Sequence, residues 1–334
     1  MATRVATRRT VGKFLDVAKL TERLVGADHV GVGEALHNAA VAMENFADPK
    51  ETLATIRRAV ELYAGAYSHS HPETANVRVQ EAVILMQIGD DATAAAVLES
   101  CGAIIGQEYG AHSEHAAAVA VRLGSAYRRL RRFEEARNQL EQVLASRERA
   151  YGADHPLVGE AQQQLALLAN AQRDYPRALA LHRSSAKIFV AALGPDHPVI
   201  SASHFGIGQA LRGEGKLAEA LVAFENARRV GETVAGAQSA TVSGPLQMIG
   251  TTLFELGRLN QAVAPLERAL AINETIECPP DELARNRLTL AEVLARLGDR
   301  ARSKELADKA RVAYEALGDD ASASRARKLL GPRS

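Results

Sequence analysis

The residues of this sequence best suited to hold a metal ion are its ten histidines, and their spacing shows what they do. Four of them recur at one position of a repeating pattern: His29, His71, His155 and His197. Packed helical layers lie about 10 Å apart, whereas all the ligands of one zinc ion lie about 2 Å from it. Because each of these histidines belongs to a different layer, we interpret them as structural linker residues.

A second group of histidines comes from two neighbouring linkers and could meet in space: His69, His71, His112 and His115. No cysteine or carboxylate stands beside them at the spacing that a zinc site needs. We therefore expect no bound metal.

Signatures of catalysis or of cofactor binding do not occur in the sequence. Gly213-Glu214-Gly215-Lys216 superficially resembles a phosphate-binding loop, but it lacks the first glycine and the hydroxyl residue after the lysine. Gly31-Val32-Gly33 matches no dinucleotide fingerprint, and no zinc-protease, nucleophile-elbow or kinase motif is present. We expect a protein without enzymatic activity and without a cofactor.

Composition and charge exclude several other classes of protein. The formal net charge is zero, which gives no overall attraction to nucleic acid or to an anionic membrane. Cys101 and Cys278 lie about four repeats apart, too far for a disulfide, so a reducing cytoplasmic compartment is expected. The basic segment 1–13 is followed by no apolar run long enough for a signal peptide or a membrane helix.

The elements that position these residues are organised by an internal repeat. Residues 151–156 read Tyr-Gly-Ala-Asp-His-Pro and recur as Leu-Gly-Pro-Asp-His-Pro at 193–198, which is 42 residues later. A glycine or serine keeps this register through six copies: Gly26, Ser68, Gly110, Gly152, Gly194 and Gly236. A fixed period of this length is typical of a solenoid, in which each unit buries its apolar side against its neighbours.

Each unit is predicted to contain two antiparallel helices. In the fourth, Asp154 or His155 can cap the first helix, and Pro156 fits its opening turn. Sister copies carry a glycine at the break between the helices, where a left-handed conformation is tolerated: Gly89, Gly215, Gly257 and Gly298. Small residues recur at one position of the first helix and indicate close helix packing: Ala40, Ala82, Gly124, Ala166, Gly208, Gly250 and Ala291.

This pattern resembles the tetratricopeptide repeat, and more narrowly the 42-residue variety found in kinesin light chains and in bacterial signalling proteins. The resemblance is carried by a large residue before a small one, as in Leu123-Gly124 and Ile207-Gly208, and by Tyr175 three residues before Ala178. It implies an all-α fold, a right-handed α-solenoid superhelix of helix-turn-helix repeats.

The predicted domain organisation follows the repeat. Residues 1–25 form an N-terminal arm and a capping helix, which begins at Phe14, and residues 317–334 form a C-terminal capping helix and tail. Between them stand seven repeats: 26–67, 68–109, 110–151, 152–193, 194–235, 236–277 and 278–316.

The candidate binding site is a polar stripe on the first helices, which we expect to line the concave groove of the superhelix. Its residues are Asn38, Asn45, Asn76, Gln80, Gln87, Arg122, Ser125, Arg129, Gln164 and Gln209. Carboxamides donate and accept hydrogen bonds, so a row of them can hold the main chain of an extended peptide. Arg122 and Arg129 suit an acidic or phosphorylated ligand. The alternative is a solvated polar surface without a ligand.

The sequence therefore predicts a non-enzymatic scaffold that binds a peptide or protein partner in its groove. A second interpretation is the regulatory arm of a bacterial signalling system, because the repeats are similar to those that accompany some serine/threonine kinases. No kinase motif occurs here, so phosphotransfer would belong to another domain or to a partner.

Overall fold

The structure, a computed structural model, describes residues 2–44, 47–276 and 278–331. Over these ranges the regular elements are sixteen α-helices and no strand. The first of two compact units, residues 1–152, contains α1 (Ala2–Val25), α2 (Val30–Met43), α3 (Pro49–Tyr67), α4 (Pro72–Gln87), α5 (Asp91–Tyr109), α6 (Glu114–Arg129) and α7 (Phe133–Tyr151).

The second unit, residues 153–334, contains the other nine of these helices. They are α8 (Pro156–Ala171), α9 (Tyr175–Leu193), α10 (Pro198–Gly213), α11 (Leu217–Ala235), α12 (Ala240–Glu255), α13 (Leu259–Ile276), α14 (Pro280–Leu297), α15 (Arg300–Leu317) and α16 (Asp320–Leu330).

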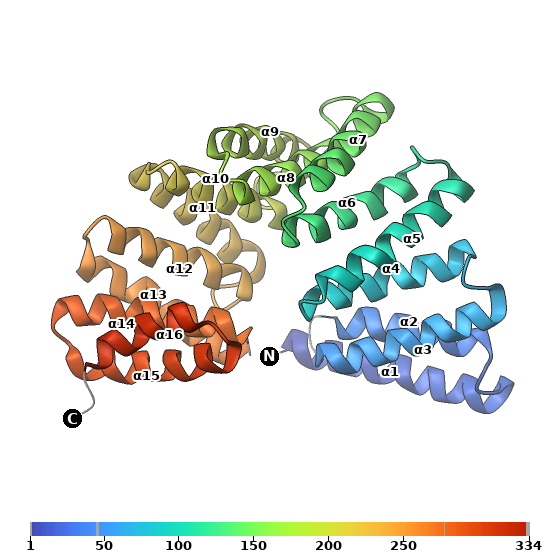
Figure 1. Cartoon of the computed structure of the whole chain (residues 1–334), viewed down its shortest axis with the longest axis horizontal. Coiled ribbons are helices and arrows are strands. Elements are labelled where there is room, and N and C mark those ends of the chain that lie inside the picture. Colours follow the sequence, from blue (N-terminus) through green and yellow to red (C-terminus); the bar gives the residue numbers. More distant parts are fainter. Residues whose placement is uncertain (1, 45–46, 277, 332–334) are drawn as a thin grey trace. The chain divides into compact units, whose positions relative to one another are not determined.

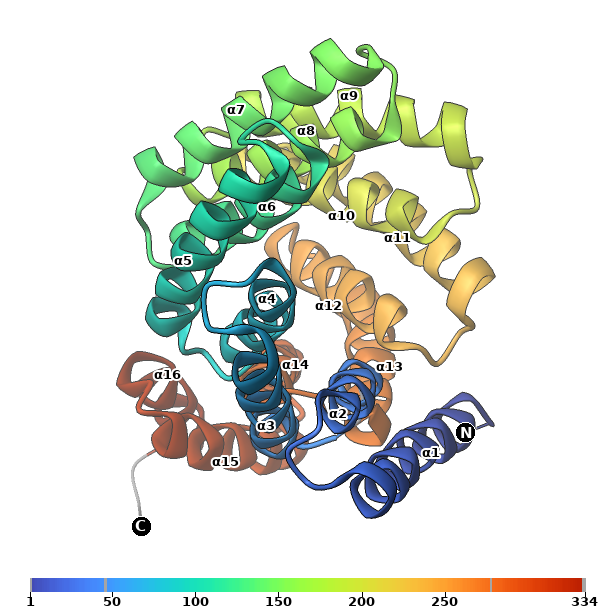
Figure 2. The ribbon, with the colours of Figure 1, turned by 90° about the vertical axis from the view of Figure 1, so that its right-hand side faces the viewer.

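Within each unit every helix packs against the next one along the chain. Figure 1 and Figure 2 follow this order in the first unit from α1, in blue, to α7, in green. We call α2, α4, α6, α8, α10, α12 and α14 the first helices, and α3, α5, α7, α9, α11, α13 and α15 the second helices. The predicted all-α solenoid of helix pairs is confirmed.

Histidine side chains cap the N-termini of four of the first helices. In each case the ring Nδ1 accepts a hydrogen bond from the backbone N–H two residues further on. The distances are 3.0 Å at His29, 3.2 Å at His71, 3.2 Å at His155 and 3.3 Å at His197. The ring thus satisfies one of the N–H groups that a helix leaves unpaired in its first turn. The linker histidines have the structural role that their spacing predicted, and the structure shows that this role is helix capping, by His155 and not Asp154 in the fourth repeat.

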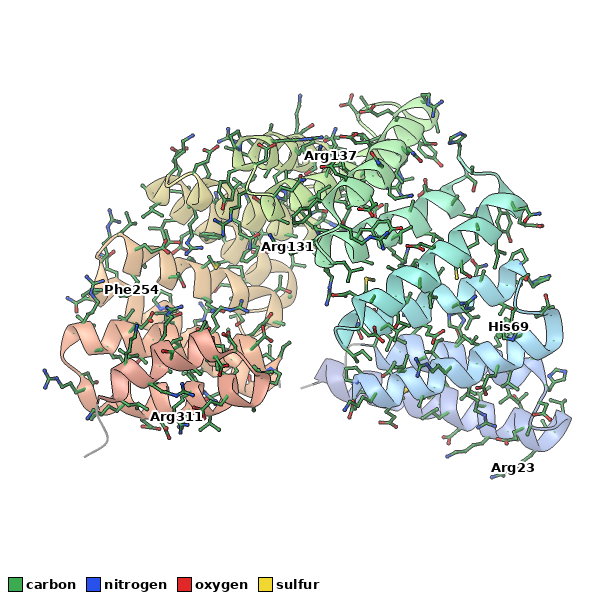
Figure 3. The ribbon with its side chains drawn as sticks, viewed as in Figure 1. Arg23, His69, Arg131, Arg137, Phe254 and Arg311 are labelled. Atoms are coloured by element: carbon green, nitrogen blue, oxygen red, sulfur yellow. The ribbon has the colours of Figure 1, made fainter. Side chains whose placement is uncertain are left out.

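The turn between the helices of a pair requires a left-handed residue. Gly89, Gly215 and Gly257 have φ angles of 84°, 78° and 73° there. Arg131 and Arg173 occupy the same position in their repeats and have φ angles of 60° and 63°; Figure 3 labels Arg131. A residue with a Cβ atom is strained in this conformation by about 1–2 kcal/mol. These two turns are therefore less favourable than their glycine counterparts.

Small residues let the two helices of a pair approach closely. A Cβ atom added to Gly208 on α10 would lie 2.6 Å from the Phe224 ring on α11. At Gly124 it would lie 2.8 Å from Leu140, and at Gly250 2.4 Å from the Leu266 side chain. Since no real carbon atoms approach so closely, glycine is a packing requirement at these positions.

The N-terminal helix differs from its prediction. It was expected to begin at Phe14, but α1 begins at Ala2, so the basic segment is helical. Its apolar stripe is only partly covered: Ala18 is buried, whereas Leu20 and Leu24 are 54% and 73% exposed. The reason is that, among the described helices, α1 packs mainly against α2, with one ion pair from Glu22 to Arg58 on α3, and has no helix on its other side.

Gly208→Val tests the close approach of α10 and α11. The larger side chain must push Phe224 aside, and overpacking of this kind costs roughly 1–3 kcal/mol or more. Hydrogen exchange should show lost protection in α10, α11 and the helices beside them, and little change at α15 and α16. Ala202→Val, on the exposed side of α10, is the control. Equal loss of protection in every helix would contradict nearest-neighbour stabilisation.

Arg173→Gly tests the strained turn between α8 and α9. We expect the free energy of unfolding to rise by about 0.5–1 kcal/mol, because relief of the left-handed strain exceeds the entropy that glycine loses on folding. Arg173→Ala keeps the Cβ atom and should leave the stability unchanged. Denaturant midpoints of the two variants measure the difference, and equal midpoints would refute the explanation.

Candidate functional site

In the first unit, two carboxamides of the polar stripe bind the same carboxylate. Asn38 on α2 and Asn76 on α4 are exposed. The Gln80 amide donates to Glu44 Oε2 at 2.9 Å, and the Gln87 amide donates to Glu44 Oε1 at 3.2 Å. Glu44 follows the end of α2, so these bonds join α2 to α4. Asn45, which the sequence placed in the same stripe, lies outside the described residues.

The two arginines of the stripe have partners within the protein. Arg122 Nη1 donates to the Ala118 carbonyl of its own helix at 3.0 Å. Arg129 Nε lies 2.7 Å from Asp91 Oδ1, at the start of α5. Ser125 lies half-buried between them on α6. An anionic ligand would therefore have to compete with Asp91 for Arg129.

The neighbouring arginines are dispersed and do not form one basic cluster. Arg128 is half-buried, and burial followed by repulsion from Arg129 lowers its pKa. The Arg132 guanidinium stacks 4.2 Å from the centre of the Tyr127 ring, and its Nε lies 3.0 Å from Glu135. Arg131 lies 5.5 Å from the Phe133 ring. Arg122 and Arg129 are the arginines that remain candidates for contact with a ligand.

In the second unit the stripe is less exposed. Gln164 on α8 and Gln209 on α10 are both half-buried. Three residues after Gln209, Arg212 donates from Nε to Glu255 on α12 at 2.8 Å. An ion pair thus joins these two first helices, as the bonds to Glu44 join α2 and α4.

Sequence reasoning missed the carboxylates Glu44 and Asp91, which bind the stripe residues Gln80, Gln87 and Arg129, and Glu255, which binds Arg212 beside the stripe. A usable signal was present in the spacing. Gln87 lies 43 residues after Glu44, and Glu255 lies 43 residues after Arg212. One repeat period plus one residue therefore brings side chains on successive first helices into contact.

Two of the four histidines from the neighbouring linkers, His71 and His115, stack on tyrosine rings. His71 stacks on Tyr67 with 4.8 Å between ring centres, and His115 stacks on Tyr109 at 4.5 Å. In the part of the chain that the structure describes, no three histidine, cysteine or acidic residues are grouped as a metal site would require. Burial raises the pKa of the Cys101 thiol to about 11, so it is not a reactive thiolate.

His182 on α9 is fully buried at a position where other repeats have Leu140 or Leu266. Its ring lies against Gly206, where an added Cβ atom would come within 2.3 Å. Asn170 Nδ2 lies 3.3 Å from His182 Nε2, and His182 Nδ1 has no hydrogen-bond partner among the described residues. Burial lowers the pKa of His182 to about 4, so the ring is neutral at physiological pH.

The family comparison matches the central part of the chain. A model of the tetratricopeptide repeat matches residues 115–189, 163–233 and 201–275. No curated protein sequence matches significantly. None of the described helices combines the length and the apolar character that crossing a membrane requires.

Solved structures share the fold at low sequence identity. TPR-like repeats of a candidate kinesin light chain from Podosopora anserina are 22% identical, with a TM-score of 0.51, over 63% of this chain and 99% of that one. A Rap protein complexed with competence and sporulation factor is 12% identical, with a TM-score of 0.56, over 98% and 97%. Yeast Tom70 is 15% identical, with a TM-score of 0.60, over 96% of this chain and 59% of Tom70.

The helix pairs and their packing define the protein as an α-solenoid repeat protein, a class that presents extended binding surfaces. The family match over residues 115–275 and the fold shared with solved structures identify the type of repeat more closely. Residues 115–275 match tetratricopeptide repeats, and the chain is similar in fold to kinesin-light-chain-like repeats.

The buried histidine predicts a pH-dependent stability. The unfolded chain binds a proton near pH 6.5, whereas folded His182 does so only near pH 4. The contribution of neutral His182 to the free energy of unfolding is therefore fully present above pH 6.5. It is lost as the pH falls toward 4, and the total loss is roughly 3 kcal/mol. The His182→Leu variant should lose less stability than the wild type over this pH range. Urea midpoints at several pH values measure the difference. Replacing the exposed His69 with alanine is the control, and parallel curves for wild type and His182→Leu would refute the assignment.

Proposed function

We propose that this protein is a non-enzymatic scaffold that holds an extended segment of a partner protein against its first helices. The observation that carries the proposal is the carboxamide surface of α2 and α4. There Asn38 and Asn76 are exposed, and Gln80 and Gln87 are oriented by Glu44. Carboxamides held in this way can bind peptide N–H and C=O groups without selecting one sequence.

The comparisons support this proposal at the level of the fold. The Rap structure contains its complex partner, competence and sporulation factor, and its fold covers nearly the whole of this chain. The two cysteines, one of them a buried thiol, are free and suit a reducing compartment, so we place the scaffold in the cytoplasm.

We further propose that the partner segment is acidic or phosphorylated. Arg122 is bound by a single backbone carbonyl, which a guanidinium with five donors can retain while it binds an anion. Arg129 already pairs with Asp91 and would exchange one carboxylate for another. Arg122 should therefore contribute more to affinity than Arg129, because it loses no ion pair on binding.

Peptide libraries test the proposed function. An acidic or phosphorylated peptide should bind the Arg122→Ala variant about tenfold more weakly than the wild type, a typical loss for one charge-assisted contact. Its affinity for the Arg129→Ala variant should fall by less than this. Arg149→Ala is a matched control, because Arg149 on α7 also donates to a carbonyl of its own helix, that of Ala145. Affinity should fall as salt rises.

Full affinity of the Arg122→Ala, Arg129→Ala double variant, or affinity that ignores salt, would show that the arginines do not select the ligand. If Asn38→Ala, Asn76→Ala also kept full affinity, the carboxamide surface itself would be excluded as the binding site.

A further inference from the structure

The first unit contains a cavity of about 330 Å³ between two successive second helices, α5 and α7. We call it the second-helix pocket. Its residues include Gly102 and Gly106 on α5, Ala116 and Ala120 on α6, and Gln142 and Ser146 on α7. None of the stripe residues Arg122, Ser125 and Arg129 lines it. The volume lies within the range of small ligand pockets, about 300–1,000 Å³.

The pocket exists because this repeat has small residues where other repeats have large ones. Residues one or more periods of 42 away show the contrast. Gly102 corresponds to Leu144, Ala186, Arg228 and Leu270, Ala116 to Val158, Ile200 and Val242, Ala120 to Leu246, and Ser146 to Ile188, Val230 and Ile272, so the four small residues occur together in this repeat alone among those compared. A Cβ atom added to Gly102 would make only an ordinary contact, 3.7 Å from Val119 Cγ1. The truncated side chains therefore leave usable space.

The acidic residue in the lining of the pocket, Glu99, is paired with neighbouring groups. Glu99 at its edge accepts a hydrogen bond from the Tyr127 hydroxyl at 2.7 Å, and its Oε1 lies 3.6 Å from Arg132 Nη1. Burial, and then the bond to Glu99, raises the pKa of Tyr127 to about 12, so the hydroxyl keeps its proton. The lining residues that the structure describes include no lysine or arginine. A negatively charged ligand group would find no cation in this lining to compensate its loss of water, and a positively charged one would have to compete with Arg132 for Glu99.

One wall of the pocket carries neutral hydrogen-bonding groups in a row. Gln139, Gln142 and Ser146 follow one another along α7, and the Ser146 hydroxyl donates to the His112 carbonyl at 3.2 Å. The eight residues from Gln139 to Ser146 span about 10 Å of helix. Three residues of extended chain cover about the same length. This row suits the backbone of a peptide better than a compact small molecule.

A second hollow lies between α13 and α15, also two successive second helices, and it differs from the second-helix pocket in its lining. It has a volume of about 270 Å³, but Leu270 stands there where Gly102 stands in the second-helix pocket. Glu267, Glu274, Arg302 and Glu305 also line it. The second-helix pocket therefore differs from this hollow in its smaller side chains and in having fewer charged residues in its lining.

We propose that the second-helix pocket binds an aromatic or branched aliphatic side chain of a neutral, extended peptide segment from a partner protein. The side chain fills the space left by Gly102, Ala116 and Ala120, and Gln139 and Gln142 bind the flanking amides. This site is separate from the first-helix surface, and a ligand bound here does not depend on Arg122.

Blocked neutral tetrapeptides that differ only at one residue test the proposal on the full chain. Methyl NMR signals of Val119, Leu123 and Val143, which line the pocket, should shift and saturate with phenylalanine or leucine at that residue. Peptides with alanine, glutamate or lysine at that residue should bind at least fivefold more weakly than the phenylalanine and leucine peptides. Arg122→Ala should bind all five peptides unchanged, so failure of the groove proposal and of this one can be told apart.

Filling the space should abolish binding. Ser146→Ile and Gly102→Leu restore residues that other repeats carry, and each should weaken the phenylalanine peptide at least tenfold. Ala145→Leu, on the exposed side of α7, is the matched control and should bind normally. Melting curves verify that each variant is folded. Normal binding by both folded filling variants would overturn the proposal.

Benzyl alcohol separates a peptide site from a site for small apolar molecules. Gln139→Ala, Gln142→Ala should weaken the peptide about tenfold and leave the binding of benzyl alcohol unchanged. If the peptide binds no more tightly than benzyl alcohol, the proposed role of the peptide backbone is wrong. Absence of saturable shifts with every probe would overturn the site altogether.

Discussion

The close approach of the two helices in each pair is the constraint on which the rest of this structure depends. At Gly124, Gly208 and Gly250 there is no room for even one carbon atom beyond the backbone. A large residue of the second helix, such as Phe224 or Leu266, fills the place where that atom would be. The contact recurs with the period of the sequence, so each unit repeats the same local solution and stability is carried between neighbours.

A second regularity governs the polar surface of the first helices. Side chains on successive first helices meet one period plus one residue apart, as Glu44 meets Gln87 and Arg212 meets Glu255. Such contacts are partly exposed and contribute little stability individually. Their effect is to orient carboxamides and guanidiniums that would otherwise rotate freely. A scaffold that binds main chain benefits from this preorganisation.

Several residues of this chain differ from the residue type found at the same position in the other repeats. Arg131 and Arg173 replace turn glycines, and His182 occupies a leucine position in the core with only one hydrogen bond to its ring. Gly102 and Ser146 replace bulky residues and open the second-helix pocket. A repeat protein tolerates such local costs because the neighbouring units remain unaffected.

The sequence by itself determined the helix pairs, their close packing and the structural role of the linker histidines, but it left open whether Asp154 or His155 caps α8. The reason is that each depends on local residue types repeated at a fixed spacing: a cap, a turn glycine, a small residue. It also identified the polar stripe as a candidate surface, although its binding role is still a prediction.

Only the tertiary structure decided which partners these polar residues have, because contacts of Arg129 with Asp91 or of Gln80 with Glu44 join residues on different helices. The same holds for the exposure of Leu20 and Leu24, which depends on what packs beyond α1. The second-helix pocket likewise arises from four small residues spread over three helices, and their combined effect is a volume that no single stretch of sequence encodes.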